Sequence, residues 1–282
     1  MKKNGIPKAS KAYQNLDFLN SPDARTIRML SEFLEPQRRF RQDKIRDTIV
    51  FFGSARIKPR AFAAKELRRL KSLFKNTRRL TRNQLRMFRH AQVQLEMSRY
   101  YEDATTLGRL LTEWTQSLRE PNRFVVCSGG GPGIMEAANK GAYLGKGKSI
   151  GMNISLPFEQ TANPYITPGL NFEFHYFFMR KLWFVYLAKA LVVFPGGFGT
   201  LDEMMEVLTL VQTQKVKKKI AIVIYGSEYW SKVLDLQTMV DRGLITNDDL
   251  KLFRFIDTPE EAFEYLKKFL LTHYGEGVDR IH

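Results

Sequence analysis

The sequence predicts an α/β fold in which helices cover both faces of a doubly wound parallel sheet. Short apolar runs alternate along the chain with segments of helical periodicity, and several runs end in glycine-rich turns. Strands that alternate with helices imply crossover connections, and hence parallel pairing. The runs are apolar throughout rather than at every second residue, as burial of both sheet faces requires.

Five apolar runs are predicted as buried strands, because they are rich in strand-forming residues and end at glycine or polar residues. They are Thr48 to Phe52, Phe124 to Cys127, Ser149 to Ile154, Ala190 to Phe194 and Ile220 to Tyr225. Phe253 to Ile256 is a weaker sixth candidate.

Helical spacing of apolar residues predicts the segments between these strands. The expected helices are Ala104 to Arg119, Ile134 to Leu144, Tyr176 to Ala188, Leu201 to Gln212, Tyr229 to Arg242 and Glu260 to Leu271. The last of them follows Thr258-Pro259-Glu260-Glu261, which is a typical helix start.

Two stretches depart from the alternation. Residues 1–47 form a polar N-terminal arm with one amphipathic segment, Asp23 to Leu34. Residues 56–103 form a long basic insertion with helical spacing and no strand. We therefore predict one Rossmann-like domain over residues 48–282, interrupted by the insertion 56–103 and preceded by the arm.

The positive charge of the chain is concentrated in the insertion. The net charge is +16, and residues 56–100 hold fourteen Lys and Arg against Glu66 and Glu96, so they account for +12. Apolar spacing there suggests two amphipathic helices broken near Asn76 or Thr81. One interpretation is a solvated hairpin whose apolar seam packs on the core or on a neighbouring subunit. The other is a binding surface for RNA, DNA or another anionic surface, without base-specific recognition because interleaved aromatic residues are lacking.

Composition and targeting features favour a globular protein of the cytoplasm. Hydrophobic residues make up 44% of the chain, and Cys127 is the single cysteine, so no internal disulfide or Cys-rich metal cluster is expected. We interpret Cys127 as a buried strand residue. Met1 to Lys11 leads into no apolar segment typical of a secretory signal. Leu182 to Phe194 contains Lys189 and is too short to span a bilayer.

Three glycine-bearing turns follow three of the predicted strands. They are Gly53-Ser54-Ala55-Arg56, Ser128-Gly129-Gly130-Gly131-Pro132-Gly133 and Pro195-Gly196-Gly197-Phe198-Gly199-Thr200. Glycine lets the backbone approach a ligand, and a helix N-terminus presents free N–H groups to an anion. A single turn of this kind would be ordinary turn chemistry, but three at strand ends favour a phosphate-binding site.

Two nucleotide-binding motifs are absent from these turns. A dinucleotide fingerprint starting at Gly129 meets Ile134 where its last glycine belongs. Gly147-Lys148-Ser149 resembles the end of a P-loop, but Ala142 occupies the first glycine position and a strand follows. These departures argue against ATP hydrolysis.

Glu203 allows two interpretations. Thr200-Leu201-Asp202-Glu203 has the pattern of a capping box, in which Glu203 would bond only the backbone of Thr200. Alternatively, its carboxylate lies beside a bound ligand and faces a cation. Arg180 and Lys181 are candidates for that cation, because an uncompensated charge in their aromatic segment would be unfavourable unless it reached the surface or an anion.

Two further polar residues stand near these motifs. His175 has no second histidine at metal-ligand spacing, so we expect no metal and interpret it as a packed or hydrogen-bonded side chain. Glu136, in the first turn after the triple glycine, interacts with the helix dipole or faces the same cleft.

These motifs resemble those of the LONELY GUY (LOG) proteins, which are nucleoside 5′-monophosphate phosphoribohydrolases that activate cytokinins. Pro195 to Glu203 fits the PGGxGTxxE signature of that family, and SGGGPGIMEAANKGA and HYFFMRK are similar to its accompanying blocks. The resemblance covers residues 48–55 and 104–271, and Ser31-Glu32-Phe33 is similar to the lead-in of longer bacterial members. Members were long labelled lysine decarboxylases, but no pyridoxal phosphate lysine supports that activity here.

The resemblance implies hydrolysis of AMP or N6-substituted AMP to the free base and ribose 5-phosphate, without a cofactor. It implies catalytic roles for Arg180 and Glu203. The implied phosphate-binding residues are Ser54, Gly130, Gly131, Gly197, Gly199 and Thr200, and the implied base- and ribose-binding residues are Glu136, Phe177, Lys181 and Asp202. Phe177 replaces a methionine common in the family, which leaves the base preference open.

The expected chemistry suits these residue types. Cleavage of a ribosyl C–N bond develops positive charge on the sugar, which a carboxylate such as Glu203 stabilises. Glu203 could also orient or deprotonate the attacking water, and Arg180 could neutralise the phosphate or leaving group and keep Glu203 ionised. The alternative is a protein that binds or senses nucleotides without turnover.

The segment Tyr176 to Tyr186 is apolar nearly all round, more than one sheet face can cover. This pattern predicts a homo-oligomer and leaves a dimer and a larger assembly both open.

Overall fold

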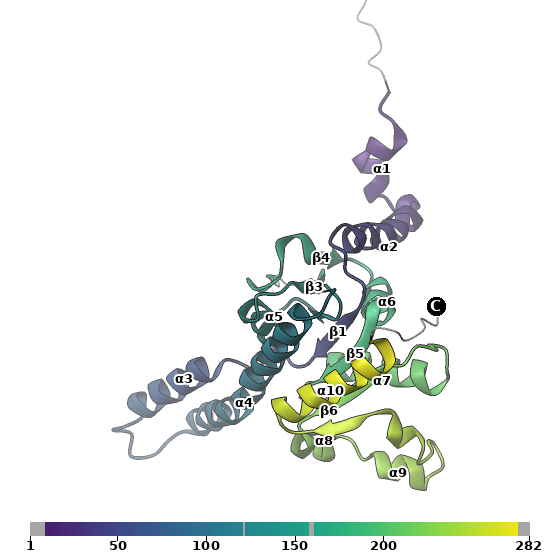
Figure 1. Ribbon diagram of the computed structural model, residues 1–282. Coiled ribbons are helices and arrows are strands. Elements are labelled where there is room, and N and C mark those ends of the chain that lie inside the picture. Colours follow the sequence, from purple (N-terminus) through teal and green to yellow (C-terminus); the bar gives the residue numbers. More distant parts are fainter. Residues whose placement is uncertain (1–8, 121, 158–160, 276–282) are drawn as a thin grey trace, which may run out of the picture.

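The computed structural model describes residues 9–120, 122–157 and 161–275, which form a doubly wound parallel sheet flanked by helices (Figure 1). The sheet has seven strands, all parallel, in the order β4-β3-β2-β1-β5-β6-β7. The strands are β1 (Thr48–Phe52), β2 (Val125–Ser128), β3 (Ser149–Ile154), β4 (Asn171–Phe174), β5 (Ala188–Val193), β6 (Ala221–Tyr225) and β7 (Arg254–Ile256). The predicted fold class is confirmed. Residues 1–8, which belong to the segment examined for a secretory signal, lie outside the described residues.

The α-helices of the described residues lie before, between and after these strands. They are α1 (Leu16–Asn20), α2 (Arg25–Gln42), α3 (Arg60–Leu73), α4 (Arg82–Gln116), α5 (Ile134–Leu144), α6 (Phe177–Leu187), α7 (Phe198–Gln212), α8 (Ser227–Val233), α9 (Leu236–Asp241) and α10 (Pro259–Tyr274). The predicted bounds of β1, β3 and α5 agree with the structure, and the Thr258 side chain caps α10 as expected.

Three secondary-structure predictions need correction. The edge strand β4 was not predicted, because its four residues alternate between exposed and buried and carry no apolar run. The helix predicted over Ala104 to Arg119 is the second half of the longer α4. The helix predicted over Tyr229 to Arg242 is divided into α8 and α9, since Leu234 is extended and Asp235 starts a new helix by accepting a hydrogen bond from the Thr238 N–H.

The sheet separates two hydrophobic clusters, and successive residues of each strand enter opposite ones. Ile49 and Phe51 of β1 belong to the cluster under α4, α5 and α10, whereas Val50 and Phe52 belong to the cluster under α6 and α7. Cys127 is buried in the second cluster, as predicted. Burial on both faces explains why the central strands are apolar throughout.

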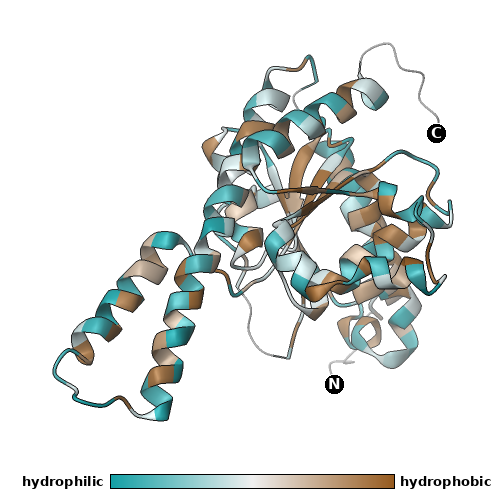
Figure 2. Ribbon diagram, turned by 90° about the horizontal axis from the view of Figure 1, so that it is seen from below, coloured by the Kyte–Doolittle hydropathy of each residue, from teal (hydrophilic) through white to brown (hydrophobic). Residues whose placement is uncertain are grey.

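The insertion forms a helical hairpin that projects from the body of the molecule (Figures 1 and 2). It consists of α3 and the first half of α4, and the chain turns between them at residues 74–81, where a break was predicted. Thr81 starts α4 with a capping box to Gln84. The hairpin has a small core of its own, made by Leu67, Leu70, Ala91, Phe74, Phe88 and Leu95. Its apolar seam therefore closes within the hairpin rather than on the domain core.

The hairpin and the domain share one continuous helix. α4 runs from the turn of the hairpin to Gln116, and its second half packs closely on α5. A Cβ on Gly108 would lie 2.8 Å from the Ala138 carbonyl oxygen, and one on Gly141 would lie 2.3 Å from that of Thr105. These two glycines allow the close helix contact, which fixes the inner half of α4 on the sheet.

The N-terminal arm is attached to the body through α2. The Phe33 and Trp183 rings stack at 5.7 Å, and the Trp183 indole donates a hydrogen bond to the Glu32 carbonyl. The Glu32 carboxylate accepts hydrogen bonds from the backbone of His175 and Tyr176 at the start of α6. This arrangement places a negative charge at a helix N-terminus, where it is stabilising. Among the described residues, no helix is both long and apolar enough to cross a membrane.

Candidate active site

The three glycine-bearing loops meet where the strand order reverses, between β1 and β5. The Ser54 N–H donates to the Pro195 carbonyl at 3.0 Å, and the Ser54 carbonyl accepts from the Ile134 N–H at 3.1 Å. The backbone of Ser54 therefore joins the first loop to both of the others. The switch point of a doubly wound sheet is the usual ligand-binding position of this fold.

A cavity of about 800 Å³ opens at this point. Six of the predicted site residues line it: Ser54, Arg180, Gly197, Gly199, Thr200 and Glu203. A volume of this size accommodates a nucleotide-sized ligand.

The third loop is built to present backbone donors. Gly196 has no room for a side chain, because a Cβ there would lie 2.0 Å from the Thr200 hydroxyl oxygen. At Gly197 and Gly199, in contrast, a Cβ would meet nothing within 4 Å. The open face of the loop is thus next to the first turn of α7. There the N–H groups of Thr200 and Leu201 bond the Gly197 carbonyl, whereas those of Phe198 and Gly199 come too early in the helix to bond one of its carbonyls.

The start of α7 contradicts the capping-box interpretation of Glu203. The helix begins at Phe198 with Gly197 as its N-cap, so Thr200 already lies inside the first turn. The Glu203 carboxylate instead accepts a hydrogen bond from the Arg180 guanidinium at 3.3 Å. Sequence pattern alone could not separate the two interpretations, since the partner lies on a different helix.

Glu203 and Arg180 are both largely removed from solvent, with 8% and 13% of their side chains exposed. Lys181 Nζ lies 3.5 Å from the second oxygen of Glu203, and also pairs with Asp202 and Glu206 at 2.8 Å each. Each oxygen of Glu203 therefore faces a cation. Arg180 and Lys181 therefore pair with carboxylates instead of extending to the surface.

The pKa of Glu203 is raised above its ordinary value, because burial disfavours the carboxylate more than Arg180 and Lys181 favour it. Arg180 thus acts in the expected direction, but the net shift is upward. Burial also lowers the pKa of Arg180, against the attraction of Glu203. Burial opposes the charge of Lys181 as well, yet hydrogen bonds to Asp202 and Glu206 outweigh it and raise the pKa of that ammonium group.

Arg180 retains donor capacity beyond its bond to Glu203. Its Nε is buried and has no hydrogen-bond partner among the described residues. Its Nη1 lies 3.9 Å from the position of a Cβ built on Gly129, so the guanidinium also reaches the second glycine loop. An anion or a leaving group in the cavity could use these free donors.

Two predicted phosphate-binding residues, Gly130 and Gly131, do not line the cavity. Their carbonyl oxygens accept hydrogen bonds from the buried Asn163 amide, and a Cβ on Gly130 would overlap the Asn153 side chain. They belong to a buried polar network that fixes the loop. Gly129, one residue earlier, is the member of the triple glycine that lines the cavity.

The four residues predicted to bind base or ribose also lie outside the cavity lining. Glu136 accepts a hydrogen bond from the Tyr101 hydroxyl at 2.6 Å, and Lys181 and Asp202 pair with each other. Phe177 is 50% exposed, and its ring lies 5.3 Å from the Arg180 guanidinium carbon. Their roles in binding base or ribose stay predictions.

Several lining residues were not predicted, and four of them come from the insertion. Arg56 and Ile57 follow the first loop directly, and Gln94 and Met97 project from α4 one turn apart. Tyr229 of α8 also lines the cavity and donates a hydrogen bond to the Gly196 carbonyl. Position after a glycine loop could have indicated Arg56, but no sequence signal connects Gln94 or Met97 with this site.

Comparison with known proteins agrees with this arrangement. Residues 135–266 match a family described as possible lysine decarboxylase, and this range includes α6, the third loop and α7. The chain is also 26% identical over 173 residues to the cytokinin riboside 5′-monophosphate phosphoribohydrolase LOG of Oryza sativa. The chain is a distant relative of the LOG/lysine decarboxylase-like proteins.

The similarity to LOG-family enzymes is distant and partial. The match to the rice enzyme covers 61% of this chain and 67% of that protein. An Arabidopsis thaliana relative, the phosphoribohydrolase LOG7, is 28% identical over 52% of this chain and 64% of its own length. The pyrimidine/purine nucleotide 5′-monophosphate nucleosidase of Escherichia coli is 31% identical over 116 residues. The match covers 36% of this chain and 23% of that protein.

Two solved structures have a weak similarity to this chain. The structure of TM1055, a structural genomics target, has a TM-score of 0.46 and 17% identity, and covers 79% of this chain and 99% of that one. The molybdenum cofactor carrier protein of Chlamydomonas reinhardtii has a TM-score of 0.41 and 20% identity, over 62% of this chain and 89% of that one.

Proposed function

We propose that this chain is a nucleoside 5′-monophosphate N-ribohydrolase that cleaves AMP or N6-substituted AMP to the free base and ribose 5-phosphate. The observation that carries the proposal is the buried Arg180–Glu203 pair, which lies on the wall of a cavity bordered by three glycine-bearing loops. The names of the plant and bacterial relatives support the same reaction class.

In the proposed reaction, water attacks C1′ of the ribose, the C1′–N bond breaks, and the leaving base takes up a proton. Glu203 stabilises the positive charge that develops on the sugar, and orients the attacking water or removes its proton. Burial raises the pKa of Glu203, so its carboxylate is a stronger base than that of an exposed glutamate and is better suited to accept that proton.

The phosphate is expected at the third loop. Gly197 and Gly199 offer backbone N–H groups at the positive end of α7, Thr200 offers its hydroxyl group, and Ser54 completes the cradle from the first loop. Arg180 supplies its unpaired donors to the phosphate or to the leaving base. Met97 and Gln94 of the insertion line the remaining part of the cavity. An apolar side chain and an amide side chain together suit the binding of a nucleotide base.

We also propose that the protein forms a homo-oligomer through α2 and α6. Phe178, Leu182 and Tyr186 share one face of α6, at spacings of four residues, and are 51%, 39% and 55% exposed. Ile27, Leu30 and Leu34 form a similar exposed stripe on α2, which packs against α6. A second copy would cover both stripes.

The activity is tested by incubating the protein with AMP, isopentenyl-AMP, GMP, CMP and UMP, and separating the products by chromatography. We expect release of free base with an equal amount of ribose 5-phosphate from at least one purine nucleotide. If none of these nucleotides releases a base while AMP still binds by calorimetry, the chain is a nucleotide-binding protein and the proposed activity is wrong.

A further inference from the structure

The outer part of the insertion hairpin carries a concentration of positive charge that the active site does not use. Residues 65–89 hold ten Lys and Arg and a single acid, for a net charge of +9. That acid, Glu66, pairs with Arg69 at 2.7 Å. The other nine, which we call the hairpin cations, are Lys65, Arg68, Lys71, Lys75, Arg78, Arg79, Arg82, Arg86 and Arg89. All are exposed, and none makes an ion pair within the described part of the chain.

Four of these cations stand where the structure least favours them. Lys75, Arg78, Arg79 and Arg82 surround the turn of the hairpin, beside the N-terminus of α4. A helix N-terminus is the positive end of the helix dipole and favours anions. The first turn of α4 contains no acidic residue, so mutual repulsion is unrelieved there within the chain. A bound polyanion would remove this repulsion.

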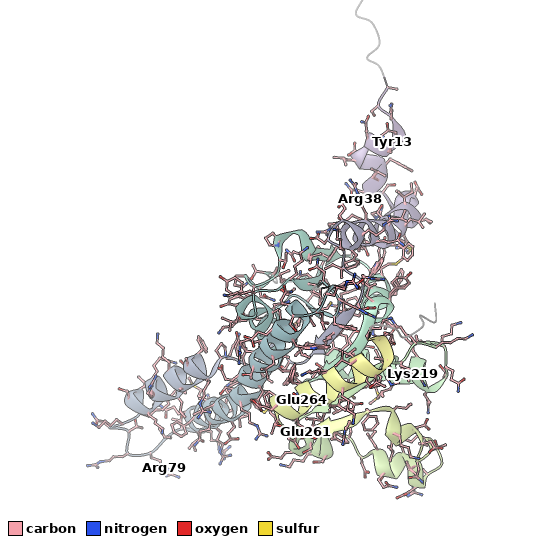
Figure 3. All side chains as sticks on the ribbon, viewed as in Figure 1. Tyr13, Arg38, Arg79, Lys219, Glu261 and Glu264 are labelled. Atoms are coloured by element: carbon pink, nitrogen blue, oxygen red, sulfur yellow. The ribbon has the colours of Figure 1, made fainter. Side chains whose placement is uncertain are left out.

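The hairpin holds these charges away from the rest of the protein. Arg79 lies at the outer end of the hairpin, far from the sheet (Figure 3). None of the hairpin cations lines the nucleotide cavity. α3 has 14 residues, and at 1.5 Å per residue it is about 21 Å long. Cations distributed over such a length match an extended polyanion better than a single small ligand.

The kinds of residue present indicate which polyanion fits. Six of the nine cations are arginines, whose planar guanidinium groups bind phosphate oxygens in pairs. Phe74 and Phe88 belong to the inner seam and are unavailable for stacking on bases. Leu67, Leu70 and Ala91 are likewise buried within the hairpin, so its apolar seam is not free to enter a membrane. The large apolar side chains of the two helices that remain exposed are Phe62, Leu73, Leu85, Met87 and Val93.

From these observations we propose that the hairpin cations bind the phosphodiester backbone of a nucleic acid, without recognition of base sequence. Backbone contacts alone give affinity that depends on salt and not on sequence. The proposal does not depend on the hydrolase activity, because the cations and the cavity occupy different parts of the molecule.

The test uses the full chain and a matched pair of fourfold variants. The hairpin variant changes Lys75, Arg78, Arg79 and Arg82 to Gln. The control changes Lys215, Lys217, Lys219 and Lys268 to Gln, which removes the same charge from exposed sites elsewhere. Lys219 lies on the opposite side of the molecule from Arg79 (Figure 3). Fluorescence anisotropy measures binding of each protein to single-stranded RNA, duplex RNA and duplex DNA over a series of salt concentrations.

We expect the unmodified chain and the control to bind with similar affinity, which falls steeply as salt rises. For duplex DNA each phosphate contact contributes about 0.9 to the slope of log affinity against log salt, so the hairpin variant should lose about 3 to 4 from that slope. Its affinity at about 50 mM salt should fall tenfold or more. The nucleic acid bound most tightly identifies RNA or DNA as the natural class.

Several outcomes would overturn the proposal. An equal loss of affinity in the two variants would show that only the net charge of the protein matters. If the unmodified chain shows no measurable binding at low salt, the hairpin is not a nucleic-acid-binding surface. Polyglutamate and vesicles containing phosphatidylserine provide further comparisons at equal charge. Tighter, hairpin-dependent binding to either would assign the hairpin to an acidic protein or a membrane instead. Circular dichroism verifies that each variant remains folded.

Discussion

The hydroxyl group of Tyr229 donates a hydrogen bond of 2.7 Å to the carbonyl oxygen of Gly196. Tyr229 belongs to α8 and also lines the cavity, so one side chain both supports the third glycine loop from behind and contributes to the site.

The Tyr229→Phe variant removes this bond and leaves the aromatic ring in place. We expect KM for the nucleotide to rise several-fold with a smaller change in kcat, because the loop proposed to bind the phosphate loses a hydrogen bond worth about 1 kcal/mol. Steady-state kinetics test this. An unchanged KM would show that the bond does not position the loop.

Gly196 and Gly197 provide a matched comparison within that loop. Gly196→Ala forces a methyl group against Thr200 and should destabilise the protein by about 1–3 kcal/mol. Gly197→Ala meets open space and should leave the thermal unfolding temperature nearly unchanged, while it interferes with phosphate binding. Equal unfolding temperatures for the two variants would contradict the packing argument.

Glu203→Gln tests the role of the carboxylate, because the amide has the same shape without the charge. We expect turnover to fall about 10²-fold or more while AMP binding remains within a few-fold. Glu206→Gln is the control, since Glu206 also contacts Lys181 but does not line the cavity. A simultaneous loss of binding and of folded structure in Glu203→Gln would show that Glu203 is structural.

The pH dependence of turnover should reveal the environment of Glu203. Its pKa is raised, so the loss of activity on acidification should begin at a higher pH than for an ordinary glutamate. Lys181 favours the ionised form, so Lys181→Met should raise this pKa further and move the acid limb of kcat to higher pH. The substrate phosphate is common to both enzymes and cannot cause a difference between them. Coincident limbs, or a shift to lower pH, would argue against Glu203 as the titrating group.

The oligomer is tested on the α6 stripe. Phe178→Glu together with Leu182→Glu should convert the assembly to a monomer in light scattering, because two charges cannot be buried in an apolar interface without partners. Tyr143→Glu changes an aromatic residue on α5 that is 63% exposed, and should leave the assembly intact. A monomeric unmodified protein at micromolar concentration would refute the proposed oligomer.

The sequence predicts the central part of this fold well because two-sided burial leaves a direct pattern. Every residue of β1 is apolar or buried, and its bounds were predicted correctly. The edge strand β4 is covered less completely, so its alternating pattern of four residues resembles a loop. Short strands at sheet edges are therefore the elements that local pattern finds least easily.

The candidate site shows the same division between local and distant information. The glycine loops were found because strand ends and turn residues are encoded locally. The contact of Glu203 could not be predicted in this way, because the pattern T-x-x-E is equally typical of a capping box. The contact that decides between the two interpretations is with Arg180, 23 residues away. Gln94 and Met97 reach the cavity only because α4 crosses the sheet at a particular angle, which periodicity alone does not specify.

The continuity of α4 has a consequence for how the length of the insertion can vary. An α-helix turns by about 100° per residue. Gln94 and Met97, which line the cavity, belong to the same continuous helix that begins at the hairpin turn. Adding or deleting one residue between Ala91 and Gln94 would rotate the outer seam, formed by Phe88 and Ala91, out of phase with α3. Length changes of about seven residues, matched in α3, restore the phase. Viable insertions and deletions in this hairpin should therefore occur in steps of two helical turns, while the cavity wall stays in place.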